Sequence, residues 1–249
     1  MASLATKSGE TLRSFGPADL DLLNRTWAED AEGALRAVLT DPAFGRVAVV
    51  SSFGAESAVL LHQVARIAPD IPVLFVSTGW LFSETLTYAD DLAAFLGLTN
   101  VQILEPDAAV LEKKDPQRLR WSYDPDGCCE IRKVNPLAEG LKHFDTWISG
   151  RKGYQAATRA NVPLFEVDDA HLKLNPLIEW NADRIQSYAA EHALPPHPLV
   201  AEGYPSIGCS PCTSKVLPGE DPRAGRWRGW DKVECGIHKT PPAGSDPVF

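Results

Sequence analysis

The sequence predicts an α/β protein built on a parallel β-sheet with helices on its faces. Three short runs rich in β-branched and aliphatic residues, 46–51, 72–76 and 101–104, support this prediction. A turn and a helical pattern follow each of the first two runs, and such alternation is typical of parallel strands connected by helices. With 249 residues, 44% of them hydrophobic, the chain is long enough to fill one large core.

The expected elements follow one another in a regular order. A packing helix is predicted where apolar residues recur at helical spacing up to the stop at Asp41-Pro42: Leu20, Leu23, Trp27, Ala31, Leu35 and Val38. The strand over 46–51 leads through a turn at 52–57 into a helix over 58–67. The unit then repeats, with a strand at 72–76, a turn at 77–80, a helix at 82–96 and a strand at 101–104.

The second half of the chain is less regular. Residues 105–127 are polar and predict a loop over the sheet, and residues 128–143 predict a helix that Pro136 kinks or divides. A strand is expected at 145–150, and Asn181 is a candidate N-cap for a helix ending before Pro195-Pro196. We divide the chain into a polar N-terminal segment (1–18), one α/β domain (19–230) and a mobile C-terminal tail (231–249).

Composition narrows the cellular setting and the partners. The first 19 residues lack the apolar segment of a secretory signal, and no run is long enough to span a membrane, so we expect a cytoplasmic protein. In that reducing compartment five cysteines indicate metal binding or catalysis rather than disulfides. The net charge of −9 disfavours binding to nucleic acid, so an anionic ligand would need a local group of cations.

The turn after the first predicted strand is a candidate anion site. Ser52-Phe53-Gly54 lies between a strand and a helix, where backbone N–H groups and a helix N-terminus stabilise negative charge. The segment has neither a Walker sequence nor the Gly-x-Gly-x-x-Gly of dinucleotide-binding proteins. Taken alone, it fits an ordinary strand–helix turn better than a phosphate site.

Four of the five cysteines form a candidate metal site. Cys128 and Cys129 are adjacent, and Cys209 and Cys212 form a Cys-x-x-Cys pair. Structural zinc prefers two Cys-x-x-Cys pairs, whereas the adjacent pair favours a 4Fe-4S cluster, with zinc as the alternative. Two pairs of free buried thiols would also fit the sequence, although each pair would then stand there by accident.

The fifth cysteine, Cys235, is a candidate nucleophile. It lies in a polar, glycine-flanked tail that has no core to fill, unlike a cysteine that acts as a small core residue. Lys232, His238 and Lys239 favour its thiolate, and Glu234 opposes it. Activation therefore requires further groups of the substrate pocket.

Basic residues near the cysteines could bind a dianion. Lys133 comes four residues after Cys129, on the same face of a helix, although a solvated surface lysine fits equally well. Lys133, Arg159, Arg223 and Arg226 could bind such a ligand by charge-assisted hydrogen bonds. A docked loop is the alternative explanation for the arginines and the nearby tryptophans.

With these motifs the chain resembles the thioredoxin-dependent adenylyl-sulfate (adenosine 5′-phosphosulfate) reductases of assimilatory sulfur metabolism. The resemblance covers about residues 47–238. Its specific parts are the two cysteine pairs and the ending Glu234-Cys235-Gly236-Ile237-His238. The other matching stretches are Ser52-Phe53-Gly54-Ala55-Glu56, Thr78-Gly79, Arg132-Lys133, Ile148-Ser149-Gly150-Arg151, Gly208, Thr213 and Gly225-Arg226-Trp227.

The resemblance implies an adenine-nucleotide α-hydrolase-like fold of the PP-loop type, with a 4Fe-4S cluster on Cys128, Cys129, Cys209 and Cys212. Cys235 would attack the sulfur of adenosine 5′-phosphosulfate, release AMP and form an S-sulfocysteine. Thioredoxin or glutaredoxin would then release sulfite, as a step of cysteine biosynthesis. The implied substrate-binding residues are Ser51, Ser52, Gly54, Thr78, Gly79, Lys133, Gly150, Arg159, Arg223, Arg226 and His238.

Some properties stay open at this level. Relatives that act on 3′-phosphoadenosine 5′-phosphosulfate usually lack the four paired cysteines, so this chain favours the substrate without a 3′-phosphate, although some relatives accept both. Ser77 stands where the family often has aspartate, and this difference concerns a hydrogen bond in the turn at 77–80 and not the chemistry. The rivals are a PP-loop ATP pyrophosphatase, whose Ser-Gly-Gly-x-Asp-Ser turn is missing, and a zinc-stabilised nucleotide-binding module. The sequence leaves the oligomeric state open and allows a homo-oligomer.

Overall fold

A six-stranded, mostly parallel sheet forms the centre of the computed structural model, which describes residues 15–238. The strands, in chain order, are β1 (Val47–Ser51), β2 (Val73–Val76), β3 (Val101–Leu104), β4 (Thr146–Ser149), β5 (Phe165–Asp168) and β6 (His171–Leu174). They lie in the order β3-β2-β1-β4-β6-β5, and all neighbours are parallel except β5 and β6. The α/β class with a parallel sheet is confirmed.

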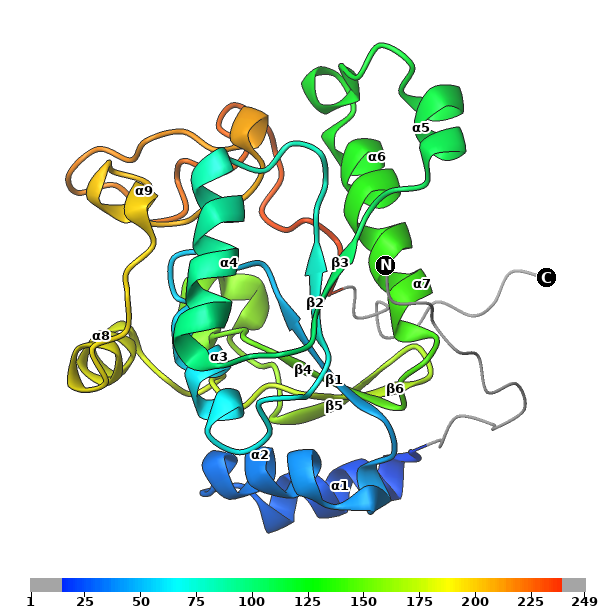
Figure 1. Cartoon of the computed structure of the whole chain (residues 1–249), viewed down its shortest axis with the longest axis vertical. Helices are drawn as coiled ribbons and strands as arrows, with labels where there is room; N and C mark the ends of the chain where they lie inside the picture. The colour runs from blue at the N-terminus through cyan, green and yellow to red at the C-terminus, as the bar shows by residue number, and fades with distance from the viewer. Residues whose placement is uncertain (1–14, 239–249) are drawn as a thin grey trace.

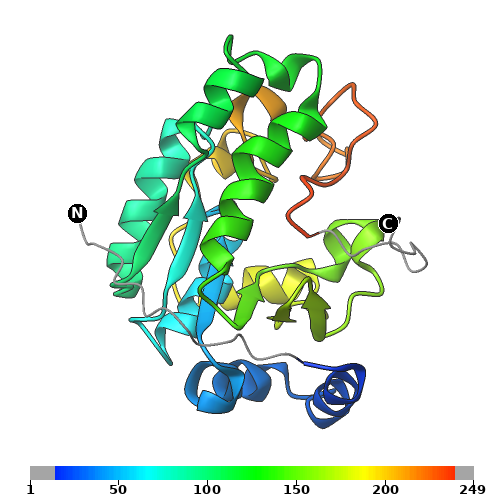
Figure 2. The same ribbon diagram turned by 90° about the vertical axis from the view of Figure 1, so that its right-hand side faces the viewer.

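Helices cover both faces of the sheet. α3 (Ser57–Ala65), α4 (Ser83–Leu96) and α8 (Ala182–Glu191) lie on one face, and a long helix made of α6 (Pro125–Cys129), a π-helical turn (Glu130–Val134) and α7 (Asn135–Leu141) lies on the other (Figures 1 and 2). The remaining α-helices are α1 (Pro17–Thr26), α2 (Ala31–Thr40), α5 (Ala108–Lys114) and α9 (Pro198–Ala201). Short 3₁₀ turns occupy Pro42–Phe44, Arg120–Ser122, Gly153–Gln155, Ala157–Arg159 and Ser210–Cys212.

The strands supply two separate hydrophobic cores because successive side chains point to opposite faces. Val49 and Val73 belong to the larger core under α3 and α4. Their neighbours Ala48 and Leu74 join the smaller core with Trp147 and the apolar residues of α7. Burial on both faces explains why the first two strands have almost no polar residues.

Several predicted elements differ from the observed ones. The single N-terminal helix is wrong: α1 and α2 are separate, and the Asp30 side chain caps α2 by accepting a hydrogen bond from the Gly33 N–H at 2.7 Å. Residues 105–127 are only partly loop, because α5 forms behind its N-cap Asp107. The β5–β6 hairpin was not predicted, since Lys173 in β6 looks unsuited to a buried strand yet is 1% exposed.

Other predictions are confirmed. The Asn181 side chain caps α8 through a 2.9 Å hydrogen bond from the Arg184 N–H. The helix after Cys128 changes from α to π before Pro136 and continues without a break; the change is needed because proline has no N–H and clashes with the carbonyl four residues earlier in a regular α-helix. The wider π turn just before Pro136 accommodates it.

The strand order places a crevice between β1 and β4. From β1 the chain builds outward to β2 and β3, then returns to add β4 on the other side of β1. Ligands of open α/β sheets bind at such switch points, outside the carboxyl ends of the strands. The segment after α9, orange to red, crosses this end of the sheet and passes beside the α6–α7 helix (Figures 1 and 2).

The described part of the tail, residues 231–238, lies against the domain, and residues 239–249 fall outside the described range, as do residues 1–14. The division into three parts therefore stays a prediction. Between residues 15 and 238 no helix combines the length and the apolar character needed to cross a membrane.

Candidate active site

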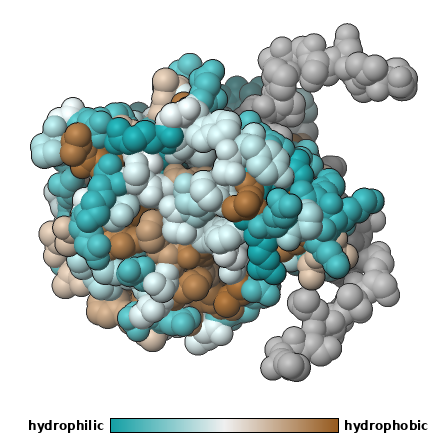
Figure 3. Space-filling view, turned by 90° about the horizontal axis from the view of Figure 1, so that it is seen from above, coloured by the Kyte–Doolittle hydropathy of each residue, from teal (hydrophilic) through white to brown (hydrophobic). Residues whose placement is uncertain are grey.

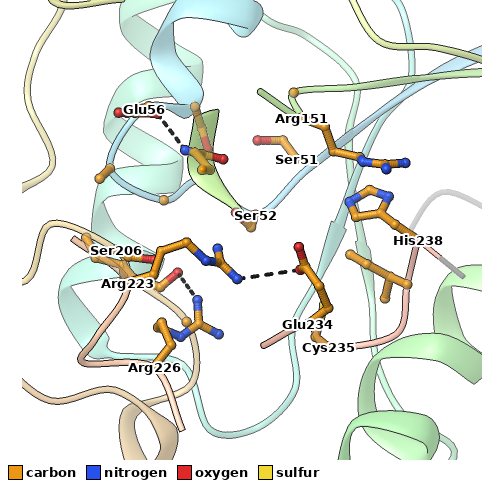
Figure 4. Close-up of a pocket in the computed structure, with 18 of the residues that line it drawn as sticks. Ser51, Ser52, Glu56, Arg151, Ser206, Arg223, Arg226, Glu234, Cys235 and His238 are labelled. Atoms are coloured by element: carbon orange, nitrogen blue, oxygen red, sulfur yellow. Dashed lines mark hydrogen bonds and ion pairs between the residues drawn. The ribbon is translucent and has the colours of Figure 1, made fainter. Parts of the chain in front are cut away.

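A cavity of about 210 Å³ lies at the carboxyl ends of β1 and β4, at the switch point of the strand order. Seen from above, this side of the molecule carries mostly hydrophilic residues with apolar patches between them (Figure 3). The close-up shows side chains from β1, from the loop after β4 and from the C-terminal segment turned toward a common space (Figure 4). Ten predicted site residues line the cavity: Ser51, Ser52, Gly54, Lys133, Gly150, Arg159, Arg223, Arg226, Cys235 and His238.

The turn after β1 forms one wall of the cavity. Phe53 is fully buried at a positive φ of 48°, and its N–H donates to Ser51 Oγ at 3.2 Å. Phe53 packs edge-on against Phe75 of β2, which holds the turn on the sheet. This anchoring directs Ser52 and Gly54 toward the cavity and brings the N-terminus of α3 beside it.

The cavity is strongly cationic. Six basic side chains and only two carboxylates occur among its described lining residues. Lys152 pairs with Glu56 at 3.1 Å, and Arg151 pairs with Glu166 at 2.8 Å. Burial lowers the pKa values of both Arg151 and Lys152, which the paired carboxylates partly offset. The uneven charge makes the cavity a site for an anion.

Glu56 connects the two loops that border the cavity. Its carboxylate accepts hydrogen bonds from the hydroxyl of Tyr154 and the amide of Gln155, both at 2.7 Å. Together with Lys152, these partners tie the turn after β1 to the loop after β4. Four residues of the cavity are not among the predicted site residues, although two of them directly follow a strand end: Glu56, Arg151, Lys152 and Gln155.

All four paired cysteines line a second, smaller cavity. Cys128 and Cys129 end α6, where Asp124 caps the helix through a 2.8 Å hydrogen bond from the Gly127 N–H. Cys209 is tied to the second strand–helix turn by a bridge to Leu81. The other lining residues are Trp80, Trp121, Pro125, Arg132, Lys133, Pro211, Arg226 and Trp227.

The four thiols ionise with different ease. Burial, together with the neighbouring cysteines, raises the pKa of Cys128 to about 12, and burial raises that of Cys129 to about 11. Burial also raises the pKa of Cys212. For Cys209 burial opposes ionisation, but Lys133, a hydrogen bond from Thr78 and Arg226 outweigh it and lower the pKa.

A buried polar network supports the cysteine cavity. The hydroxyl of Thr78 lies 3.3 Å from Cys209 Sγ, and Arg132 donates to the Thr78 carbonyl at 2.9 Å. Arg132 also forms a 2.8 Å ion pair with Asp115, with both side chains almost fully buried. Thr78 and the adjacent Gly79 therefore lie behind the cysteines, away from the lining of the larger cavity.

Lys133 lines both cavities and so stands between them. Burial lowers the pKa of its ammonium, but Cys209 and Cys235 outweigh this effect and raise it. The π turn that contains Lys133 directs it inward from the cysteine helix. The expectation of a cation between the four cysteines and the anion site agrees with this placement.

The side chain of Arg226 passes close to Gly208 and reaches the larger cavity. A Cβ at position 208 would lie 2.2 Å from the Arg226 guanidinium, so a larger residue there would displace this side chain. Arg226 Nη1 donates to the carbonyl of Ile207 at 3.3 Å, and its Nε, which is buried, has no hydrogen-bond partner within residues 15–238. The loop thus presents an unused donor beside the anion site.

The C-terminal segment closes the cavity. Cys235 and His238 both line it, and His238 stacks on Trp147 with ring centroids 5.6 Å apart. Burial and the nearby Lys173 and Arg151 hold the pKa of His238 well below its usual value. Lys232, buried beside Trp227, forms an ion pair with Asp126 at the start of the cysteine helix.

Known proteins resemble the chain in sequence and in fold. Residues 46–215 match the family described as the phosphoadenosine phosphosulfate reductase domain. A protein of Mesorhizobium japonicum named adenosine 5′-phosphosulfate reductase is 52% identical over 77% of this chain and 76% of its own length. One of Mycolicibacterium smegmatis with the same name is 40% identical over 88% and 94%.

Solved structures extend the comparison. Phosphoadenylyl-sulfate reductase from Candida auris superposes with a TM-score of 0.69 at 27% identity, covering 83% of this chain and 100% of that chain. An FMN adenylyltransferase of Candida glabrata matches with a TM-score of 0.53 at 14% identity, covering 77% and 66%, and shares the fold alone.

Proposed function

Since the chain belongs to the phosphoadenosine phosphosulfate reductase family, we propose that it reduces adenosine 5′-phosphosulfate to sulfite and AMP. Relatives that are 37–52% identical to it over 77–93% of its length are named adenosine 5′-phosphosulfate reductase. The observation that carries the proposal is the cationic cavity at the β1–β4 switch point, in which Cys235 meets Lys133 and the arginines. An anion with two negative groups, such as a phosphate and a sulfonate, matches the positive charge of this cavity.

The reaction divides into two steps. The thiolate of Cys235 attacks the substrate sulfur, so an S–S bond forms, the bond from sulfur to the bridging oxygen breaks, and AMP leaves with that bonding pair. Lys133, Arg159, Arg223 and Arg226 stabilise the charge that develops on the phosphate and sulfonate oxygens. The Ser51–Gly54 turn and Gly150 border the part of the cavity that would receive the nucleotide.

A dithiol reductant completes the cycle. A thiolate of thioredoxin, or of a glutaredoxin, attacks Cys235 Sγ and expels sulfite, and its second thiol then breaks the mixed disulfide. The dithiol is oxidised and the sulfonate sulfur is reduced. Because Cys235 is half-buried in the closed cavity, the segment that carries it has to move outward for this step.

We propose that the four remaining cysteines hold a 4Fe-4S cluster, although within residues 15–238 no three potential ligands are grouped as they would be around a single metal ion. All four face one small cavity, and burial disfavours the thiolate forms of Cys128, Cys129 and Cys212, so a cationic group is needed to ionise them. Adjacent ligands also suit a cube better than a tetrahedral zinc ion. When bound, the cluster would supply a redox-capable iron–sulfur surface beside Lys133.

Turnover with two substrates tests the proposed activity. The purified protein, with thioredoxin as the reductant, should release sulfite from adenosine 5′-phosphosulfate faster than from the 3′-phosphorylated analogue. A clear preference for the analogue would assign the chain to the other substrate of the family. Formation of neither sulfite nor AMP from either compound would contradict the function.

Metal content tests the cofactor separately. Protein purified without oxygen should be brown, absorb broadly in the visible range and contain about four iron ions per chain. Colourless protein with stoichiometric zinc would overturn the cluster assignment and leave the activity to be judged on its own.

A further inference from the structure

The residue before the proposed nucleophile occupies the anion site. The Glu234 carboxylate accepts hydrogen bonds from Arg159 Nε at 2.6 Å and from Arg159 Nη2 at 2.8 Å. It also lies 3.5 Å from Arg223 Nη2, and Figure 4 shows Glu234 and Arg223 turned toward each other. Two of the four cations proposed to bind the substrate therefore already hold an anion.

The geometry of this contact is that of a ligand. A guanidinium with two parallel N–H groups on a carboxylate forms the same fork that it forms with a phosphate or a sulfonate. Burial disfavours the charge on Glu234, but Arg159 and Arg223 outweigh it and lower its pKa. The carboxylate thus stays ionised and competes for the arginines.

The arginine does not depend on Glu234 for its position. Arg159 Nη1 donates separately to the Gln155 side chain at 2.9 Å, and Gln155 is fixed in turn by Glu56. Arg159 would therefore remain in the cavity wall if Glu234 left. The segment 231–238 is held further by an ion pair of Lys232, by Ile237 and His238 packed beside Trp147, and by the Val233 carbonyl, which accepts from Arg223 at 2.7 Å. None of these contacts is a strand pairing, so the segment can leave without disrupting the sheet.

We propose that Glu234 is a placeholder anion: it fills the Arg159–Arg223 site in the empty protein and is displaced when a sulfonate or phosphate group arrives. Displacement frees the segment that bears Cys235, so anion binding is coupled to movement of the nucleophile. The inference rests on the proposed function for the identity of the anion. The competition itself does not depend on turnover.

Binding of inorganic sulfate to the full-length protein tests the competition. Glu234→Gln keeps the shape of the side chain and removes its charge, and it should bind sulfate about tenfold more tightly than the unchanged protein, because the arginines are no longer occupied. Glu234→Asp keeps the charge and should stay within about threefold of the unchanged protein. Calorimetric titration at low ionic strength measures both.

A matched control lies earlier in the chain, outside the segment 231–238. Glu220 also forms a two-fold contact with an arginine, at 3.0 and 2.9 Å from Arg228, but neither residue lines the cavity. Glu220→Gln should leave sulfate affinity unchanged. If Glu234→Gln binds sulfate no more tightly than the unchanged protein, or as Glu220→Gln does, Glu234 merely stabilises the fold and the proposal fails.

Release of the segment gives a second readout. Lys232 has a side chain only 6% exposed, so trypsin should cut after it slowly in the empty protein. Sulfate should speed this cut severalfold in the unchanged protein, and Glu234→Gln should be cut fast without sulfate. Mass spectrometry identifies the released peptide, and equal rates in all samples would contradict the coupling.

Failure of the placeholder proposal can be distinguished from failure of the proposed function. Tighter sulfate binding by Glu234→Gln without any sulfite formation by the unchanged protein would reject the function and keep the placeholder. Sulfite formation with no change in sulfate affinity would do the opposite. In an active enzyme the variant should lower KM for the adenylylated sulfate without raising kcat.

Discussion

The cysteine cavity and the Cys235 segment use the same residue type in opposite settings. Cys128, Cys129 and Cys209 are 7–8% exposed and are held by a capped helix, a backbone bridge and buried hydrogen bonds. Cys235 is half-buried in a segment outside the sheet, which is attached by the side chains of Lys232, Glu234, Ile237 and His238 and by the Val233 carbonyl. A fixed thiol suits metal binding, whereas a nucleophile that must meet both substrate and reductant has to be able to move.

The largest effect should come from replacing one cysteine in each region. Cys235→Ser should lower sulfite formation on the order of 10⁴-fold or more, because the nucleophile is lost, while iron content stays normal. Cys209→Ser should instead lose iron along with activity. Iron analysis beside a turnover assay separates the two, and a Cys235→Ser protein without iron would contradict the division.

Lys133 is the link between the two regions, and its removal should have the next largest effect. Lys133→Ala should lower kcat/KM by about 10²- to 10³-fold, as the loss of one preorganised hydrogen-bond donor to the transition state does. Lys142→Ala, on the exposed end of the same helix, is the matched control. An effect no greater than that of the control would remove Lys133 from the reaction.

The hydrogen bond to Cys209 should matter less. Thr78→Val keeps the volume and removes the hydroxyl 3.3 Å from the sulfur, and it should speed loss of iron to a chelator by about tenfold. Thr99→Val, at an exposed position, is the control. Iron release at the control rate would show that the hydroxyl does not stabilise the metal site.

The smallest effect is expected where the tail meets the cysteine helix. Asp126→Asn removes the partner of Lys232, but an exposed carboxylate contributes little, so kcat should change by less than about threefold. Tryptic cleavage after Lys232 should nevertheless become faster. An unchanged cleavage rate would mean that other contacts, such as that of Glu234, hold the segment alone.

The sequence predicts the central sheet well and its outer parts poorly. β1 and β2 are apolar because both of their faces are buried. The β5–β6 hairpin is not predictable in this way, because its charged residues Lys173 and Glu166 can be buried only as the ion pair that they form in the fold. The separation of α1 from α2 depends on the local cap at Asp30.

The functional site was predictable where residue type determines chemistry. All four paired cysteines gather at one cavity. Apart from Thr78 and Gly79, all ten candidate substrate and nucleophile residues line the other. From the sequence alone, Glu234 is only a charge that opposes the thiolate of Cys235. Its contact with Arg159, 75 positions earlier, needs the fold.

The position of the transferred sulfonate distinguishes a nucleophile at Cys235 from a thiol of the metal site. The protein is incubated with adenosine 5′-phosphosulfate without a reductant, and intact-mass and peptide mass spectrometry then locate the added sulfonate. We expect one sulfonate on Cys235, removed by thioredoxin, and none on the Cys235→Ala variant, whose iron content stays normal. A sulfonate on any of the four paired cysteines, or on the variant, would contradict the separation of a fixed metal site from a mobile nucleophile.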